Sequence, residues 1–224
     1  MGELRMIRTD TPLEVAAGLI CEALKDLSHP RLAVAGGSAA GALGLARKAL
    51  GPRWQQMRLT WVDERQVPFG SPESNRGEAY RLADLDPKDP PALELPLFLD
   101  GETASEASQR VEDALHRDFK SGLDFLLLGM GEDGHIASLF PGRPWPKGLV
   151  HEVEDSPKPP SRRISLGLEL LGRTPAVLVV LGATKADALG RLLRGDQALP
   201  ASHSSHITVV TDLKIPILKG EHRG

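Results

Sequence analysis

The feature that most constrains the fold is a repeated unit: a short apolar run, then a glycine, then a helix-forming stretch. The clearest run is 124–128, which is apolar at every position after Asp124 and is followed by Gly129. Runs this uniformly apolar are typical of parallel strands that are buried on both faces. The chain therefore predicts a three-layer α/β fold of the doubly wound, Rossmann-like type, with a mostly parallel central sheet and helices on both faces.

The same pattern predicts the other elements. Helix signals are N-cap residues, a proline in the first turn and closing glycines. The segment 63–81 is polar and contains two prolines and two glycines, so it is predicted to be irregular. The predicted strands are 31–35, 58–62, 124–128, 164–166, 176–181 and 207–211, and the predicted helices are 11–27, 39–50, 103–120 and 185–193.

Composition narrows the class of protein. A chain of 224 residues, 41% apolar and 25% charged, suits a single globular domain over 1–224 and excludes bulk disorder. With a net charge of -3, the chain has no excess of positive charge to attract nucleic acid, so a nucleic-acid-coating role is excluded. The one cysteine favours a reducing, cytoplasmic setting. No apolar run approaches the roughly 20 residues of a membrane span, and residues 1–10 lack a signal-peptide pattern.

Two glycines and a serine follow the predicted strand 31–35. Glycine lets backbone N–H groups approach a ligand without a Cβ atom in the way. A helix start adds free donors and the positive end of the helix dipole. We therefore expect Gly36, Gly37 and Ser38 to bind a phosphate or carboxylate, with Ser38 as the N-cap; the alternative is an ordinary tight turn. No G-x-x-x-x-G-K-[ST] pattern is present, so this is not a nucleotide P-loop.

Charged residues follow the predicted strand 58–62, at the edge of the sheet where α/β proteins bind ligands. Asp63 and Arg65 come directly after the strand, and Asn75 lies further along the same polar segment. An aspartate and an arginine together supply a proton acceptor and a donor to anions. The alternative is a solvated loop, the usual fate of charge clusters.

The most informative stretch is 129–135, Gly-Met-Gly-Glu-Asp-Gly-His, directly after the central strand. It satisfies the G-x-G-x-x-G pattern of dinucleotide-binding proteins. However, Glu132 and Asp133 would place negative charge where a pyrophosphate must sit. Pro141 also leaves barely two turns for a helix that starts at His135. We therefore disfavour dinucleotide binding.

His135 is instead the candidate catalytic base. In the first turn of a short helix, the positive end of the dipole would disfavour the imidazolium and leave a neutral ring able to accept a proton. Asp133 is close enough in sequence to orient that ring. The alternative is a histidine whose nitrogens bond only to the local backbone.

Two cations complete the set of candidate residues. Lys185 is predicted at the first position of the helix 185–193, where a positive charge opposes the helix dipole. Such a local conflict is expected at functional sites, and an anion bound near that helix end would resolve it. Arg163 follows the stiff segment 157–160 and offers a second contact to the anion. The alternative for both residues is ordinary surface charge.

Together these segments resemble the 6-phosphogluconolactonase family, within a superfamily that includes the glucosamine-6-phosphate deaminases. The matching stretches keep the family's order. The longest and most specific is DFLLLGMGEDGHIASLFPG at 124–142. The others are LAVAGGS (32–38), WVDERQVP (61–68), SN (74–75), RISL (163–166), GATKADAL (182–189) and LPAS (199–202).

The deaminases share the Asp-Gly-His-Ile-Ala core and are the alternative. They carry Asp-Glu-Tyr where this chain has Asp-Glu-Arg at 63–65, and Ala-Phe-Asn-Glu-Pro where it has Ala-Ser-Leu-Phe-Pro at 137–141; both features here are similar to the lactonases. Ala39 and Ala40 replace the lactonases' usual Thr-Pro, which removes a hydroxyl and predicts weaker phosphate binding. The end of the chain, 213–224, also differs from the usual ending.

The resemblance implies hydrolysis of 6-phospho-D-glucono-1,5-lactone without a metal, cofactor or covalent nucleophile. His135 would activate water, Asp133 would orient His135, and Asp63 would assist or hold a sugar hydroxyl. Arg65 would bind the phosphate or stabilise the oxyanion. The implied partner is a small sugar phosphate, bound by a monomer or small homo-oligomer in the cytoplasm. The remaining residues implied to bind substrate are Gly36, Gly37, Ser38, Asn75, Gly131, Arg163 and Lys185.

Overall fold

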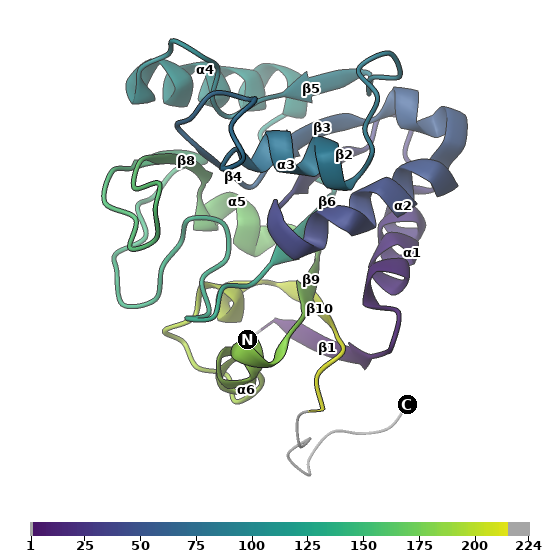
Figure 1. The fold of residues 1–224 in the computed structure, drawn as a ribbon, viewed down its shortest axis with the longest axis vertical. Coiled ribbons are helices and arrows are strands. Elements are labelled where there is room, and N and C mark those ends of the chain that lie inside the picture. Colours follow the sequence, from purple (N-terminus) through teal and green to yellow (C-terminus); the bar gives the residue numbers. More distant parts are fainter. Residues whose placement is uncertain (1, 215–224) are drawn as a thin grey trace.

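Seven parallel strands form the centre of the molecule in the order β1-β10-β9-β6-β2-β3-β5 (Figure 1). The computed structural model describes residues 2–214, so most of the divergent end of the chain lies outside the described residues. The strands are β1 (Glu3–Arg8), β2 (Arg31–Val34), β3 (Arg58–Trp61), β5 (Leu93–Leu95), β6 (Phe125–Gly129), β9 (Ala176–Val180) and β10 (His206–Thr211).

Helices α1 and α2 lie on one side of these strands, and α5 and α6 lie on the other (Figure 1). The predicted doubly wound α/β fold with a mostly parallel sheet is therefore confirmed. The helices are α1 (Pro12–Leu24), α2 (Ala40–Leu50), α3 (Asn75–Leu82), α4 (Ala104–Phe119), α5 (Leu168–Arg173) and α6 (Ala186–Leu193). Short 3-10 segments are η1 (Gly37–Ala39), η2 (Gly51–Gln56), η3 (Ala183–Lys185) and η4 (Pro200–His203).

The helices predicted at 11–27, 39–50, 103–120 and 185–193 and the central strand are confirmed to within a few residues. The local signals that predicted them hold for β6, for the start of α4 and for the end of α2, whereas α1, α2 and α6 begin without a side-chain cap. Strand β6 is the middle strand of the seven, and its first four residues are buried. Helix α4 begins with a capping box: the Thr103 hydroxyl accepts the Glu106 N–H at 3.2 Å, and the Glu106 carboxylate accepts the Thr103 N–H at 2.9 Å. Helix α2 ends at Gly51, whose φ of 54° suits glycine.

A second, antiparallel sheet has the order β4-β8-β7, and it corrects one prediction. Its strands are β4 (Asp63–Arg65), β7 (Val150–Val153) and β8 (Arg163–Leu166). The segment 63–81 is therefore not irregular: it starts as a strand with Asp63 and Glu64 buried, and it contains α3. The burial of these carboxylates was not predicted, because it depends on contacts that form only in the fold: Glu64 accepts from the start of α3, and Asp63 contacts Asn75, Ser138 and Arg163. Strands β1, β5 and β7 were not predicted, since none of them contains an apolar run and β5 and β7 are also short.

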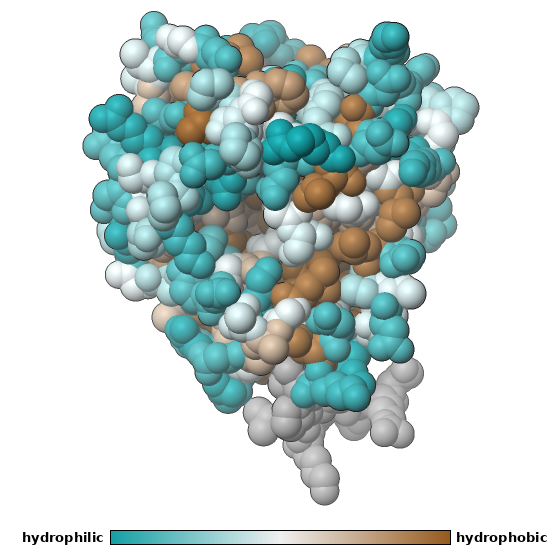
Figure 2. Space-filling view, viewed as in Figure 1, coloured by the Kyte–Doolittle hydropathy of each residue, from teal (hydrophilic) through white to brown (hydrophobic). Residues whose placement is uncertain are grey.

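The face drawn in Figure 2 is mainly hydrophilic, with apolar side chains gathered over the region of α2. The large apolar side chains that are exposed among the described residues are Leu27, Leu45, Phe69, Leu82 and Leu99. Within residues 2–214, no helix is both long and apolar enough to span a membrane.

Candidate functional site

Ten of the eleven predicted site residues line one pocket of about 160 Å³ at the carboxyl ends of the parallel strands. The eleventh, Asp133, contacts His135 directly. Doubly wound folds bind ligands at this edge, because the loops that follow neighbouring strands meet there. The pocket is lined by Ala35, Gly36, Gly37, Ser38, Asp63, Arg65, Asn75, Gly129, Met130, Gly131, His135, Ala137, Arg163 and Lys185.

The central pair of the site is Asp133 and His135. The His135 Nδ1 lies 2.5 Å from the Asp133 Oδ1, so a ring protonated at Nδ1 leaves Nε2 as a proton acceptor. The hydrogen bond from His135 holds the pKa of Asp133 well below its ordinary value. The Phe140 ring packs on the imidazole, with the two ring centroids 4.8 Å apart. A carboxylate, an oriented imidazole and an aromatic wall are suited to accepting a proton from water.

The predicted short helix after His135 is wrong. Residues 131–135 form a glycine turn, in which the Gly131 N–H donates to the His135 carbonyl at 2.9 Å and the Gly134 N–H donates to the Gly131 carbonyl at 3.0 Å. Ile136 then pairs with Leu139 in an isolated bridge. The helix-dipole argument for a neutral His135 therefore fails, and the ring is oriented by Asp133 instead.

Gly131 is required by this close approach. A Cβ atom there would lie 2.1 Å from both Cε1 and Nδ1 of His135 and 2.7 Å from Oδ1 of Asp133. Gly134 has a φ of 91°, which suits only glycine, and a Cβ on it would meet a Leu199 methyl group at 2.6 Å. The two glycines thus allow the histidine and the aspartate to face each other within a tight turn.

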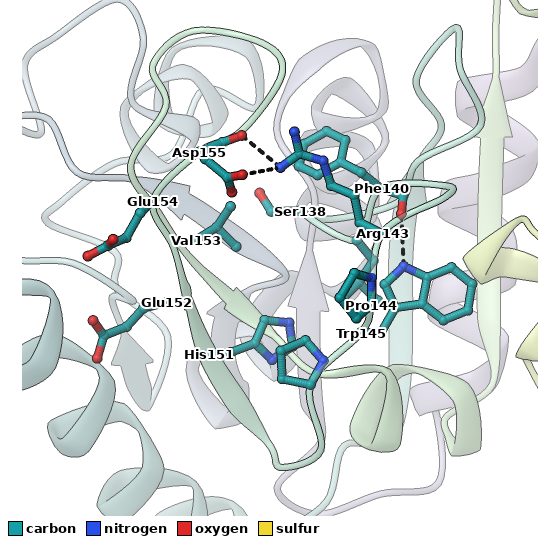
Figure 3. Close-up of a pocket in the computed structure, with 12 residues that line it drawn as sticks. Ser138, Phe140, Arg143, Pro144, Trp145, His151, Glu152, Val153, Glu154 and Asp155 are labelled. Carbon is teal, nitrogen blue, oxygen red and sulfur yellow. Dashed lines mark hydrogen bonds and ion pairs between the residues drawn. The ribbon is translucent and has the colours of Figure 1, made fainter.

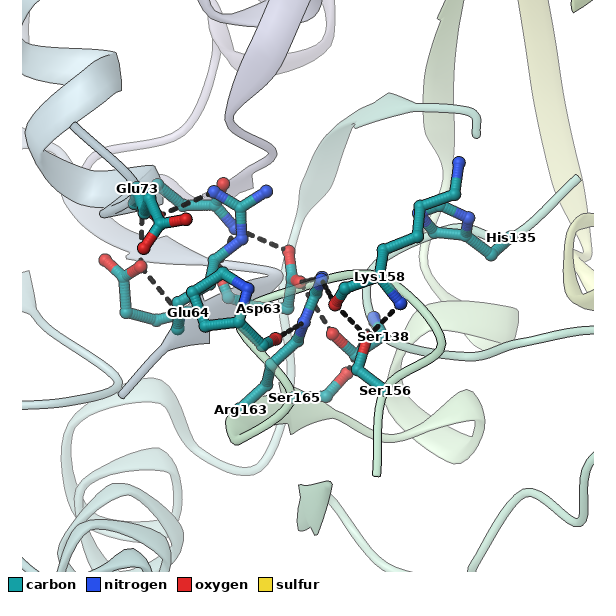
Figure 4. A network of polar contacts seen from close by, with 12 residues as sticks. Asp63, Glu64, Glu73, His135, Ser138, Ser156, Lys158, Arg163 and Ser165 are labelled. Carbon is teal, nitrogen blue, oxygen red and sulfur yellow. Dashed lines mark hydrogen bonds and ion pairs between the residues drawn. The ribbon is translucent and has the colours of Figure 1, made fainter. Parts of the chain in front are cut away.

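Beneath the pocket, Asp63 is the centre of a buried polar network (Figure 4). Its Oδ1 accepts from the Asn75 Nδ2 at 2.9 Å, and its Oδ2 accepts from the Ser138 hydroxyl at 2.7 Å. The Arg163 Nη1 lies 3.5 Å from the same Oδ2. With both oxygens bonded within the protein, Asp63 is suited to hold Asn75, Ser138 and Arg163 in place rather than to transfer a proton. Ser138, which directly precedes Leu139 and Phe140, was not predicted as a site residue.

The register of the small sheet explains why Arg65 and Arg163 meet, since β4 and β8 pair them directly. The two guanidinium groups nevertheless differ. Arg163 is buried and donates to the carbonyl groups of Lys158 at 2.7 Å and Pro160 at 3.1 Å. Arg65 donates to the Glu73 carbonyl at 2.7 Å, and its Nε has no partner among the described residues. Burial also lowers the pKa of Arg163. Each guanidinium nitrogen of Arg163 contacts Pro160, Lys158 or Asp63, so Arg65 is the guanidinium with donors still available to an anion.

Glu64, also missed as a site residue, anchors the start of α3. Its carboxylate accepts the N–H groups of Arg65, Asn75 and Arg76 at 2.7 to 2.8 Å. Burial raises the pKa of Glu64, and these N–H groups oppose that effect because they bind the charged form. The carboxylate therefore fixes the position of Asn75, which in turn holds Asp63. The signal in the sequence that could have identified Glu64 is the run of three charged residues at 63–65, directly after a predicted strand.

Lys185 lines the pocket, but not as the first residue of a capped helix. It ends η3 and is the N-cap of α6, one residue before the helix proper, and no side chain caps this helix start. Burial lowers the pKa of Lys185. Among the described residues its ammonium forms no ion pair, so it remains available to an anion.

The glycine turn after β2 also differs in detail from the prediction. Ser38 lies inside η1 and caps no helix, because α2 begins at Ala40 without a side-chain cap. A Cβ on Gly36 would lie 2.4 Å from Oδ1 of Asn75, which explains the glycine. The Gly37 N–H, expected to face a bound anion, donates to the Glu78 carboxylate at 2.7 Å.

Metal-binding clusters were not predicted, and residues 2–214 contain no group of three or more His, Cys, Asp or Glu side chains placed to hold an ion.

A second pocket, of about 270 Å³, is lined in part by Ser138 and Phe140 (Figure 3). Its walls include Trp145, Pro144 and His151. His151 is 8% exposed, and neither ring nitrogen has a partner among the described residues. Burial therefore lowers the pKa of His151, and the ring is neutral in the folded protein.

His151 should make folding sensitive to acid. The pKa of His151 is lower in the folded than in the unfolded chain. As the pH falls, His151 is therefore protonated in the unfolded chain before it is protonated in the folded one. Its stabilising contribution is thus complete above pH 6.5 and is lost as the pH falls from there towards the folded pKa. Each unit of pKa depression corresponds to about 1.4 kcal/mol in the free energy of unfolding.

We expect His151→Phe to lose less stability than the parent between pH 7.5 and pH 5, measured by urea unfolding. The exposed His29→Phe should behave like the parent; equal acid sensitivity in all three proteins would contradict the prediction.

Comparison with known proteins gives the family. The model for "Glucosamine-6-phosphate isomerases/6-phosphogluconolactonase" matches residues 11–211. The 6-phosphogluconolactonase of Rattus norvegicus is 37% identical over 158 residues, covering 67% of this chain and 60% of that protein. That of Mycobacterium bovis is 38% identical over 165 residues, covering 67% of this chain and 66% of that protein. The matched part of the chain thus spans three fifths to two thirds of these relatives.

Solved structures share the fold. The 6-phosphogluconolactonase of Thermotoga maritima has a TM-score of 0.76 at 22% identity, covering 94% of this chain and 99% of that one. A monomeric glucosamine-6-phosphate deaminase has a TM-score of 0.74 at 20% identity, covering 94% of this chain and 97% of that one. The fold therefore does not separate the two branches. With the family match extending from α1 to the end of β10, the chain belongs to the family of glucosamine-6-phosphate isomerases and 6-phosphogluconolactonases.

Proposed function

We propose that this protein hydrolyses 6-phospho-D-glucono-1,5-lactone to 6-phosphogluconate. The observation that carries the proposal is the Asp133–His135 pair beside a polar pocket lined by Arg65 and Lys185. The substrate combines an anionic phosphate with an activated ester carbonyl, so it needs cations to hold it and a base to activate water. The lactonase relatives at 37% and 38% identity support the same reaction.

In this mechanism His135 accepts a proton at Nε2 from the water that attacks the lactone carbonyl. A C–O bond forms, and the carbonyl oxygen becomes an oxyanion. When the tetrahedral intermediate collapses, the ring C–O bond breaks and the proton on Nε2 passes to the ring oxygen. Asp133 remains ionised and stabilises the imidazolium through Nδ1.

The cations divide the work according to their existing contacts. Arg163 holds Asp63 and the loop at Lys158 and Pro160, so it shapes the pocket. Lys185 and Ser38 bind the phosphate, and the free donors of Arg65 bind the phosphate or the oxyanion. Asn75 and Gly131 position Asp63 and His135. A cytoplasmic location and a monomeric or small oligomeric state remain predictions.

The reaction is tested by generating the δ-lactone from glucose 6-phosphate with its dehydrogenase and following its decay with and without this protein. We expect clear acceleration over the spontaneous hydrolysis. Folded protein that gives no acceleration would overturn the proposal. Release of ammonia from glucosamine 6-phosphate would then assign the protein to the deaminase branch.

Lys185→Ala is expected to raise KM for the lactone roughly tenfold and to lower kcat less, because phosphate binding mainly holds the substrate and also orients it. Initial rates over a range of lactone concentrations separate the two effects. Lys147→Ala removes an exposed lysine outside the pocket and serves as the control. An unchanged KM in Lys185→Ala would remove this residue from phosphate binding.

A further inference from the structure

The carboxylate of Glu78 lies at the Gly37 N–H, a donor that the sequence predicts to bind an anion. The carboxylate accepts this N–H at 2.7 Å, and Gly37 lines the candidate active site. Glu78 lies on the first turn of α3, where its own N–H donates to the Ser74 carbonyl at 2.8 Å. Glu78 is not among the residues that line the pocket, and the family resemblance implies no role for it.

This position is held by the packing of α3 against the glycine turn. Asn75, at the start of α3, lies so close to Gly36 that a Cβ there would clash with it. Asn75 is in turn fixed by Glu64 and Asp63. These contacts fix the position of the backbone from which Glu78 extends, whereas its half-buried side chain has rotatable bonds through which the carboxylate can leave the Gly37 N–H.

The contact is between a carboxylate and a backbone donor, with no cation to balance the charge. Among the described residues Glu78 forms no ion pair, while Arg76 beside it is paired with Glu94 at 2.5 Å. A carboxylate oxygen accepts a backbone N–H as a phosphate oxygen does. An incoming phosphate must therefore do without this donor or displace Glu78, and the two anions repel each other.

We propose that Glu78 is a built-in competitor for the phosphate of the substrate and thereby sets the affinity of the site for phosphorylated ligands. The inference rests on the proposed function for the identity of that ligand. It does not depend on turnover, because the competition is visible in binding alone.

The test compares two substitutions by titration calorimetry. Glu78→Gln keeps an acceptor for the Gly37 N–H and removes the charge, whereas Glu78→Leu removes both. We expect 6-phosphogluconate and inorganic phosphate to bind both variants roughly tenfold more tightly than the parent, about 1.4 kcal/mol. Gluconate, which has no phosphate, should show no gain. Glu14→Gln changes the net charge equally at an exposed position in α1 and should match the parent.

The outcomes separate this inference from the proposed function. Unchanged or weaker phosphate binding by both variants, with melting temperatures like that of the parent, would show that Glu78 only supports the turn. The same gain for gluconate would also overturn the competition. If 6-phosphogluconate fails to bind any of the proteins while phosphate binds the variants more tightly, the competitor role stands and the proposed substrate does not.

Discussion

Replacing His135 with alanine is expected to lower kcat for the lactone about 10³-fold, the usual scale of a lost general base. The imidazole is the ring that Asp133 orients at 2.5 Å, and within residues 2–214 no other histidine lines the pocket. The measurement is the decay of lactone generated in place, corrected for spontaneous hydrolysis. His29→Ala removes an exposed histidine and should leave the rate unchanged.

Thermal unfolding of His135→Ala distinguishes a catalytic from a structural histidine. The side chain is 16% exposed and packs on Phe140, so its loss should change the melting temperature little compared with the change in rate. A loss of activity that runs parallel to a loss of stability would assign His135 a structural role. Full activity in a folded variant would keep the reaction but remove His135 from it.

The second large effect is expected for Gly131→Ala, which adds one methyl group. That group cannot coexist with the present positions of His135 and Asp133, because the distances of 2.1 and 2.7 Å are far inside contact range. The ring must move, and small displacements of a reacting group cost about 10²-fold in rate. We expect kcat to fall by about that factor while binding of 6-phosphogluconate is largely retained.

A matched substitution controls for the change from glycine to alanine. A Cβ on Gly18 in α1 would meet no atom of the described part of the chain within 4 Å, and Ala is the better helix former. Gly18→Ala should therefore keep full activity and gain slightly in stability. Wild-type kcat in Gly131→Ala would mean that the turn relaxes without disturbing the pair, and the tight geometry would then be irrelevant to catalysis.

Much of the site could be anticipated because doubly wound folds bring their strand ends together. The residues after β2, β3, β6 and β9 were predicted to meet, and the pocket contains residues from all four segments. Asp133 and His135 are two residues apart, so their pairing needed only a tight turn. The prediction of a helix after His135 was wrong, because Gly131 and Gly134 form a tight turn there instead.

The sequence by itself determined the apolar strands β2, β3, β6 and β9 and thus which loops lie at the ligand-binding edge, because burial patterns and turn chemistry are properties of short segments. Only the tertiary structure decided what each polar group there binds. Asp63 accepts from Ser138, 75 residues away, and the Gly37 N–H is taken by Glu78, 41 residues away. Those partners follow from the register of β4 on β8 and the packing of α3 on the glycine turn, which no local pattern encodes.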